Sequence, residues 1–457
     1  MSRRVVVVGA GITGLTVAYR ILRSPYASEV LVVETDREPG GVIRTVRVGD
    51  LDLEAGPDAL LVRKPWALDL CYELGLEGDL MPQGATASQL LTPRGLLPVP
   101  PGRLGIPASA TGLARWKGMP VTARLRAIAE PLLPRRHSER DSSVGALLRR
   151  RLGRGATDAL VAPLLAGIYA GDIDRLSVDA AFPELAYWER ELGSLRAGAR
   201  AKAVPARRVP AGPATPFATI RGGLHRLPAA LAEALGPGTL RFGSSVVKLG
   251  REGRGPYRVA TDGGDDLPAD AVVLATPSSV SADLLAEVAP KAAELIREIS
   301  AASTAIALFV YPKGTNRRLP EAAGFVTRRG ALPITAATAV SKKWPRQAFG
   351  SRAVIRAFVG GAGLEHELDR PDDDILSSAR EALARVYRLT VEPEHAALVR
   401  WPGSMPQYAV GHLDLLGAID AALPPGLYVA GGAFRGVGIP DRVRDAGAIA
   451  DRVVRQD

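Results

Sequence analysis

The sequence predicts an α/β fold that combines a Rossmann-type domain with an antiparallel sheet and a helical insert. Its 457 residues are too many for one hydrophobic core and indicate two or three domains. At the start, a run of valines, a glycine-rich turn and a helical pattern follow one another, as in a parallel sheet buried on both faces. Residues 303–311 and 352–359 alternate or run apolar, which is typical of strands.

The first predicted strand, residues 5–8, leads through a glycine-rich turn into a helix over residues 15–22. This order is the context in which a G-x-G-x-x-G motif binds a dinucleotide. Gly9 permits the tight turn, Gly11 lets a pyrophosphate approach the backbone, and Gly14 lets the helix pack on the strand. The free N–H groups and the dipole at the helix N-terminus favour the pyrophosphate there. The predicted loop consists of Gly9, Ala10, Gly11, Ile12, Thr13 and Gly14.

The second predicted strand, residues 30–33, ends in an acid. Glu34 follows Gly14 by 20 residues, where an acidic side chain binds the ribose hydroxyls of a dinucleotide. Thr35 lies beside it and is included in the predicted site. Because the strands, the helix, the glycines and the acid all agree, the prediction is much stronger than the glycines alone would allow.

The residues after Glu34 distinguish FAD from NAD. The pattern Gly40-Gly41-Val42-Ile43-Arg44-Thr45, followed by Glu54-Ala55-Gly56-Pro57-Asp58, resembles the large flavoprotein superfamily that includes the amine oxidases. Classical NAD dehydrogenases show neither feature. The resemblance implies FAD as the cofactor, with contacts from Gly40, Gly41, Arg44, Gly56, Pro57, Asp58 and Ala59.

Later segments resemble further parts of this superfamily. A glycine pair at residues 222–223 precedes a helical pattern and then a strand with a valine at the position that contacts the adenine end. Residues 271–277 resemble the strand that returns to the FAD domain, and residues 426–440 resemble the segment that covers the flavin ring and ribityl chain. The resemblance implies a discontinuous FAD-binding domain over residues 1–80, 206–277 and 396–457. Its further cofactor contacts are Val246, Trp401, Gly432, Gly438, Ile439 and Pro440.

The remaining chain consists of a basic, helical insert over residues 81–205 and a substrate-binding domain over residues 278–395. The insert has long stretches without acidic residues. Basic, partly apolar walls suit a ligand that is apolar in the middle and carboxylated at its edge. An anionic membrane surface or a solvated arginine-rich face would fit the same pattern. The basic residues concerned are Arg94, Arg103, Arg115, Lys117, Arg124, Arg126, Arg196, Arg200, Lys202, Arg207, Arg208, Arg221 and Arg226.

The insert also contains the most specific pattern. Residues 161–172 run Val-Ala-Pro-Leu-Leu-Ala-Gly-Ile-Tyr-Ala-Gly-Asp, and residues 176–185 run Leu-Ser-Val-Asp-Ala-Ala-Phe-Pro-Glu-Leu. Both resemble the porphyrinogen oxidases of the haem pathway. The first block and residues 401–408 are more similar to the branch that oxidises coproporphyrinogen III than to the branch that oxidises protoporphyrinogen IX. Coproporphyrinogen carries four propionates and protoporphyrinogen carries two, and basic walls suit the more highly charged substrate.

The resemblance implies a six-electron oxidation in three two-electron steps, with hydride passing to the flavin and oxygen giving hydrogen peroxide. The flavin carries the chemistry, and the protein orients and desolvates the reactants, so no catalytic side chain is expected. Gly167 matches a family glycine that lies against the substrate. Arg63, Lys64 and Arg94 are candidates for binding propionates. The expected partners are the porphyrinogen, molecular oxygen and, as a further candidate, the next enzyme of the haem pathway.

Three other functions stay open. A protoporphyrinogen IX oxidase of the same fold is the nearest alternative. A flavin amine oxidase or carotenoid desaturase would share the FAD motifs but lack the block at residues 167–172. A flavin-binding partner of haem enzymes would retain FAD without turning over a substrate.

Composition and spacing argue against nucleic-acid binding, a metal site and a transmembrane helix. The 58 basic and 48 acidic residues give a net charge of +10, which favours acidic partners. Aromatic residues are only 5% and do not interleave with the arginines, which argues against nucleic acid. The five histidines lack metal-ligand spacing, so no metal is expected. A lone cysteine, Cys71, and the lack of a long apolar run predict a cytoplasmic protein with at most peripheral membrane contact.

Overall fold

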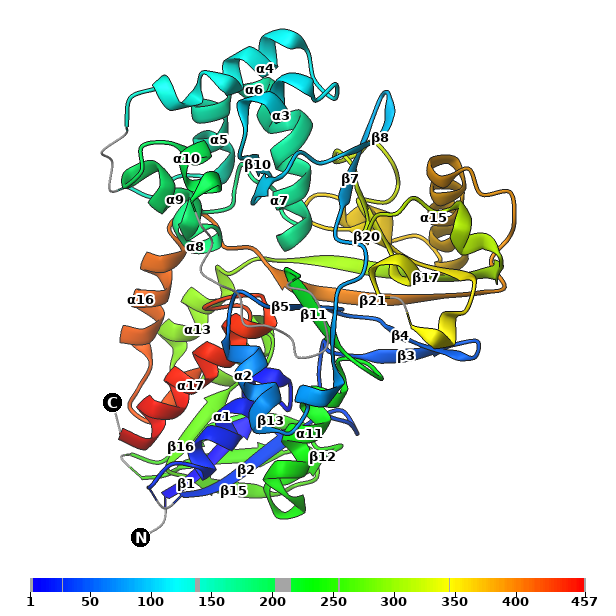
Figure 1. The fold of residues 1–457 in the computed structure, drawn as a ribbon. Coiled ribbons are helices and arrows are strands. Elements are labelled where there is room, and N and C mark those ends of the chain that lie inside the picture. The colour runs from blue at the N-terminus through cyan, green and yellow to red at the C-terminus, as the bar shows by residue number, and fades with distance from the viewer. Residues whose placement is uncertain are drawn as a thin grey trace.

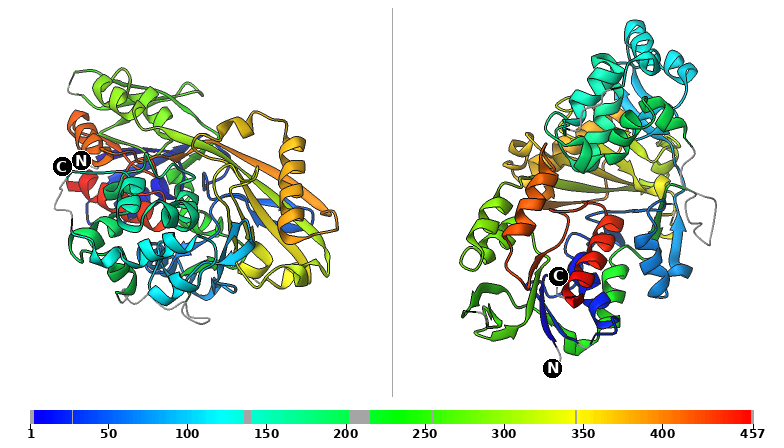
Figure 2. Two further views of the ribbon diagram at one scale, coloured as in Figure 1. Left: turned by 90° about the horizontal axis from the view of Figure 1, so that it is seen from above. Right: turned by 90° about the vertical axis from the view of Figure 1, so that its left-hand side faces the viewer.

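The computed structural model describes residues 3–26, 28–135, 140–201, 215–253, 255–344 and 346–455. A parallel sheet with its helices lies at the end of the molecule that holds both termini, an antiparallel sheet lies in the middle, and a helical insert lies at the far end (Figure 1, Figure 2). This arrangement confirms the predicted α/β fold. Three residues named above, and one of the five histidines (His137), lie outside the described ranges; the three are Lys202, Arg207 and Arg208.

The five-stranded parallel sheet is buried on both faces, as the valine run predicted. Val5 and Val7 pack into the hydrophobic core on one side of β1 (Arg3–Val8), and Val6 and Val8 pack into the core on the other side. β1 pairs in parallel with strands from both an early and a late segment, so the sheet is discontinuous in sequence. Its order is β12 (Leu240–Phe242), β2 (Ser28–Glu34), β1 (Arg3–Val8), β16 (Ala271–Leu274) and β22 (Leu427–Val429).

Helices and a small sheet cover the two faces of the parallel sheet. On the first face lie α1 (Ile12–Leu22), α2 (Trp66–Glu73), α11 (Arg226–Leu235) and α17 (Ile439–Arg455). The core on the second face comes from α12 (Ser278–Leu285), α13 (Pro290–Arg297), α16 (His412–Ala422) and the sheet β13 (Val246–Arg251), β14 (Tyr257–Thr261) and β15 (Asp266–Ala269). Because α12 and α13 pack here, this part extends past residue 277, where the sequence placed its boundary.

The seven-stranded sheet confirms the strands predicted at residues 303–311 and 352–359, which lie in β17 (Ala301–Lys313) and β20 (Arg352–Gly360). α15 (Asp372–Tyr387) packs on one face, and the hairpin β3 (Thr45–Val48) and β4 (Leu51–Glu54) packs on the other. Neighbouring strands run antiparallel except for the parallel pair β18–β7. The sheet also extends beyond residues 278–395. Its order is β21 (His395–Pro406), β17 (Ala301–Lys313), β20 (Arg352–Gly360), β19 (Ala336–Ala339), β18 (Gly324–Val326), β7 (Ser88–Thr92) and β8 (Gly95–Pro98).

The insert forms a separate hydrophobic core of short helices at the top of Figure 1. A small sheet of β5 (Leu60–Leu61), β11 (Phe217–Ile220) and β6 (Leu80–Pro82) lies where the chain leaves and re-enters the parallel-sheet part. Tyr408 joins the insert core from outside the insert. The helices are α3 (Ala110–Arg115), α4 (Val121–Ile128), α5 (Val144–Leu152), α6 (Arg154–Ala156), α7 (Ala162–Tyr169), α8 (Val178–Ala181), α9 (Pro183–Arg190) and α10 (Leu195–Arg200), beside the strands β9 (Gly102–Arg103) and β10 (Ile106–Pro107).

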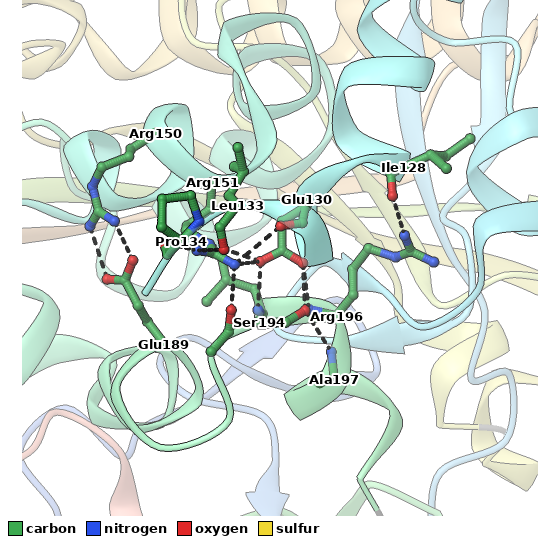
Figure 3. Close-up of polar contacts among 12 residues, drawn as sticks. Ile128, Glu130, Leu133, Pro134, Arg150, Arg151, Glu189, Ser194, Arg196 and Ala197 are labelled. Atoms are coloured by element: carbon green, nitrogen blue, oxygen red, sulfur yellow. Dashed lines mark hydrogen bonds and ion pairs between the residues drawn. The ribbon is translucent and has the colours of Figure 1, made fainter. Parts of the chain in front are cut away.

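A buried ion pair lies at the centre of the insert (Figure 3). The Arg151 side chain is 1% exposed and the Glu130 side chain 0%, and the guanidinium donates to the carboxylate from Nε at 2.9 Å and Nη2 at 2.6 Å. Glu130 also accepts from the Ser194 hydroxyl at 2.6 Å and from the Leu195 N–H at 2.9 Å. Arg151 in turn donates to the carbonyl oxygen of Gly193 at 2.6 Å. This network joins α5, α10 and the segment after α4.

Several basic residues of the insert contact groups of the protein itself. Arg126 and Arg196 donate to backbone carbonyl oxygens, for example from Arg196 to Ile128 at 2.8 Å. Arg200 donates to the Ala108 carbonyl at 2.7 Å, and Arg103 pairs with Glu184 at 3.5 Å. Arg126, Arg196 and Arg200 thus satisfy carbonyl oxygens near the ends of short helices, which composition alone does not reveal. Arg94, Arg115 and Lys117 are exposed. Arg221 and Arg226, which follow the insert, pair with Asp79.

Candidate functional site

The predicted dinucleotide loop lies between β1 and α1 and leaves the N-terminus of α1 open. Gly9 has a φ of +103°, which favours glycine in this turn. A Cβ on Gly14 would lie 2.0 Å from the carbonyl oxygen of Gly9, so only glycine lets the helix pack here. A Cβ on Gly11 would meet nothing within 4 Å. The loop therefore leaves free space directly before the helix, where a phosphate would be stabilised.

The acid after β2 points back to this loop. Glu34 accepts from the Ala10 N–H at 2.5 Å and from the Asp36 N–H at 2.9 Å. Thr35 and Ser245 place their hydroxyl oxygens 3.2 Å apart, directly before Val246 at the start of β13. The ribose and adenine positions predicted from the sequence thus lie together at the carboxyl ends of neighbouring parallel strands, where α/β sheets bind nucleotides.

Gly40 and Gly41 lie against the dinucleotide loop. Gly40 forms a β-bridge with Gly11, and its N–H donates to the Ala10 carbonyl at 2.9 Å. Arg44 pairs with Asp36 at 3.0 Å, and its guanidinium carbon lies 5.8 Å from the ring centre of Trp401. The Trp401 indole N–H donates to the Ala55 carbonyl at 2.6 Å. β21 therefore brings Trp401 next to the turn at residues 55–59.

That turn carries a buried charge cluster that the sequence did not reveal. Lys343 donates to both carboxylate oxygens of Asp58 at 3.0 Å, and the Trp344 indole N–H donates at 3.0 Å. Arg356 lies 3.4 Å from the same carboxylate and donates to the Gly56 carbonyl. Burial opposes ionisation, but the two cations outweigh it and hold the pKa of Asp58 well below its ordinary value. In the sequence, the only sign of this cluster was Arg356, a single charged residue within the apolar strand at residues 353–359.

The segment after β22 is held from two sides. The Tyr408 hydroxyl donates to the Gly432 carbonyl at 2.7 Å and accepts from the Gly436 N–H at 2.6 Å. His412 stacks on Tyr408 with ring centres 4.1 Å apart, and its Nε2 donates to the Phe434 carbonyl at 2.9 Å. This loop carries Gly432 and leads through Gly438 into Ile439 and Pro440, the first residues of α17. Tyr408 and His412 fix the backbone of the predicted flavin-covering segment.

His412 makes this loop sensitive to pH. Burial lowers the pKa of His412 below its ordinary 6.5, so the folded loop holds the neutral ring while the unfolded chain takes up a proton. We expect the melting temperature to fall as pH drops below about 6.5. Burial lowers the pKa of His225 in the same direction, but His225 is exposed and His412 is 3% exposed. The melting temperature should therefore depend less on pH in His412→Gln than in His225→Gln. An equal pH dependence of the melting temperature in the two variants would contradict this assignment.

The four predicted substrate contacts do not come together in one cluster. Lys64 pairs with Asp441 at the start of α17 at 2.5 Å, and Arg63 pairs with Glu184 of the insert at 2.5 Å. Gly167 lies exposed on α7, and a Cβ there would lie 3.9 Å from Val326. Arg94 is exposed in the turn of the β7–β8 hairpin. Lys64 thus lies at the predicted flavin-covering segment, Arg63 contacts the insert, Gly167 lies on an insert helix, and Arg94 lies in the β7–β8 turn.

The described residues fit an FAD cofactor. Open space lies at Gly11 and at the buried Gly431, which face the predicted pyrophosphate and flavin positions. Ile12 and Thr13 are buried at the start of α1, and Ala59 packs beneath the antiparallel sheet. Within the described ranges, no three histidine, cysteine, aspartate or glutamate side chains are grouped to hold a metal ion. No helix among the described residues is long and apolar enough to cross a membrane.

Comparisons with known proteins agree with this geometry. The coproporphyrinogen III oxidase of Bacillus subtilis is 35% identical over 96% of this chain and 95% of its own length. The enzyme of the same name from Staphylococcus aureus is 30% identical over 100% of both chains. The chloroplastic protoporphyrinogen oxidase of Nicotiana tabacum is 27% identical over 98% of this chain and 85% of its own length.

Solved structures support the same relationship. The crystal structure of an Exiguobacterium sp. 255-15 protein named as a protoporphyrinogen oxidase superposes with a TM-score of 0.87, at 30% identity over the whole of both chains. Putrescine oxidase, at 15% identity and a TM-score of 0.72, shares the fold. Residues 12–454 match the family described as flavin-containing amine oxidoreductases. This match, together with the full-length relatives, shows that the chain belongs to the flavin-containing amine oxidoreductase family.

Proposed function

We propose that this protein oxidises coproporphyrinogen III to coproporphyrin III in haem biosynthesis. The observation that carries the proposal is full-length similarity at 30–35% identity to coproporphyrinogen III oxidases from several bacteria. The blocks at residues 161–172 and 176–185 support it from within the sequence. Molecular oxygen is the proposed electron acceptor, with hydrogen peroxide as its product.

We propose that the parallel-sheet part, built from segments near residues 1–80, 215–299 and 407–455, holds FAD. When bound, FAD supplies the hydride-accepting chemistry. The protein binds its phosphates at Gly11, fixes its ribose with Glu34, and covers it with the loop held by Tyr408. The antiparallel sheet and the insert orient the substrate and exclude water. Further proposals are a cytoplasmic location, at most peripheral membrane contact, and transfer of the porphyrin to the next haem-pathway enzyme.

Turnover of two purified substrates tests the proposed reaction. Porphyrin fluorescence and peroxide release are measured under air with coproporphyrinogen III and, separately, with protoporphyrinogen IX. We expect faster turnover of coproporphyrinogen III. A preference for protoporphyrinogen IX would support the second candidate, which the tobacco and Exiguobacterium relatives favour by name. Oxidation of neither substrate by FAD-loaded protein would contradict both candidates.

We propose that Lys64 and Arg63, together with Gly167 and Arg94, contact the porphyrinogen. Lys64 and Arg63 are half-buried in ion pairs, and a carboxylate substrate can exchange for Asp441 or Glu184 as their partner. We expect Lys64→Gln and Arg63→Gln to raise KM by roughly tenfold each, because a charge-assisted hydrogen bond contributes about 1.5–3 kcal/mol. Arg94→Gln should have a smaller effect, since Arg94 is exposed. Lys291→Gln on α13 is the matched surface control. Unchanged KM values for Lys64→Gln and Arg63→Gln would overturn these assignments.

A further inference from the structure

Arg442 lies in the first turn of α17, beneath the loop that is predicted to cover the flavin. Its Nε donates to the Val437 carbonyl at 3.0 Å, which fixes the side chain against this loop. The side chain is half-buried by accessible surface, yet burial lowers the pKa of its guanidinium. The Arg442 side chain is therefore only partly open to solvent.

The Arg442 guanidinium has no anionic partner within the described part of the chain. No carboxylate forms an ion pair with it, and no hydrogen bond from Nη1 or Nη2 is present among the described residues. Its neighbours differ in this respect. Asp441 pairs with Lys64 at 2.5 Å and lies 3.9 Å from Arg444. A cation at this depth is costly to leave unpaired, so an anionic ligand is the partner it lacks.

One terminal nitrogen of Arg442 lies against the loop that is predicted to cover the flavin. A Cβ on Gly432 would lie 2.3 Å from Nη2 of Arg442, so the guanidinium lies directly against this glycine. The neighbouring Gly431 is buried, and a Cβ there would meet nothing within 4 Å. The guanidinium and the free space are therefore on adjacent residues of one loop. The N-terminus of α17 adds its positive dipole at the same end.

We propose that Arg442 supplies a positive charge to the bound flavin and raises its reduction potential. The proposal rests on FAD binding as set out above, and not on the identity of the porphyrinogen. Uptake of two electrons and one proton adds one negative charge to a flavin. A fixed cation nearby stabilises that charge without reorganisation of solvent. Reversible binding of sulfite to oxidised flavin also places a negative charge on the ring, so sulfite affinity reports the same effect without any substrate.

The test uses the FAD-loaded, full-length protein and its variants Arg442→Met and Arg442→Lys. Methionine keeps length without charge, and lysine keeps charge. Arg444→Met is the matched control, because Arg444 lies on the same helix with a side chain 48% exposed. FAD content per chain, sulfite affinity and the flavin midpoint potential are measured. We expect Arg442→Met to weaken sulfite binding by at least about tenfold and to lower the potential by about 30 mV for each tenfold change in the two-electron equilibrium. Arg442→Lys should stay close to wild type.

Four results decide the outcome. Arg442→Met that holds FAD with unchanged sulfite affinity and potential overturns the proposal. A raised KM for porphyrinogen with an unchanged potential assigns Arg442 to a substrate carboxylate and also overturns it. If Arg442→Met does not fold, Arg442→Lys and Arg442→Gln are compared instead, and equal potentials for these two variants contradict the role of charge. A potential shift in protein that does not oxidise coproporphyrinogen III supports the inference while the proposed substrate fails.

Discussion

Gly11→Val is expected to weaken FAD binding strongly while leaving the apoprotein folded. Gly11 has φ and ψ of −68° and 172°, which a valine adopts, and its Cβ would meet no protein atom within 4 Å. The added side chain would instead enter the space next to the helix N-terminus that we assign to the pyrophosphate. Overpacking costs about 1–3 kcal/mol, so FAD affinity should fall by roughly tenfold to a hundredfold. FAD released by heating purified protein measures this.

Gly417→Val is the control for Gly11→Val. Gly417 lies in α16, and a Cβ there also meets nothing within 4 Å. This variant should keep FAD at the wild-type ratio. The far-ultraviolet circular dichroism of both apoproteins should match that of the wild type. Full FAD content in Gly11→Val would show that the cofactor does not approach this loop, and would contradict the site.

Glu130→Gln is expected to destabilise the insert strongly. The substitution keeps the shape of the side chain but leaves Arg151, which is 1% exposed, without a counter-charge. It also weakens the acceptor for Ser194 and for the N–H of Leu195. Removing one partner of a buried pair costs about 3–5 kcal/mol. The midpoint of urea denaturation, followed by tryptophan fluorescence, should fall accordingly, since Trp116 and Trp188 lie in the insert core.

Glu73→Gln provides the matched comparison for Glu130→Gln. Glu73 accepts from Arg20 at 2.6 Å and 2.9 Å, with both side chains about one-third exposed. Exposed pairs contribute about 0.2–1 kcal/mol, so this variant should unfold close to the wild-type midpoint. If the two variants shift the midpoint equally, the buried network does not hold the insert together.

The elements that could be predicted from the sequence are those with a local signal. The valine strand, the glycine turn and the helix after it each follow from neighbouring residues, and Glu34 follows from a fixed spacing. The strands at residues 303–311 and 352–359 carried their own apolar pattern. These elements have the predicted type because backbone propensity and burial agree within each segment.

Long-range pairings could not be predicted in this way. Asp58 is joined to Lys343 across 285 positions and Lys64 to Asp441 across 377, so the partner is decided by the topology and not by sequence spacing. The same reason explains the arginines of the insert. Composition counts their charges but does not show that Arg126 and Arg196 bind carbonyl oxygens. The domain boundary at residue 277 differs because α12 and α13 carry apolar faces that match the parallel sheet.

The most direct test of the central claim mixes FAD-loaded protein with one porphyrinogen in the absence of oxygen and follows the flavin absorbance. A single turnover then reports electron transfer to the bound cofactor, independent of the acceptor. We predict rapid bleaching with coproporphyrinogen III, slower bleaching with protoporphyrinogen IX and none with a primary amine. Bleaching by the amine, or by protoporphyrinogen IX alone, would contradict the account.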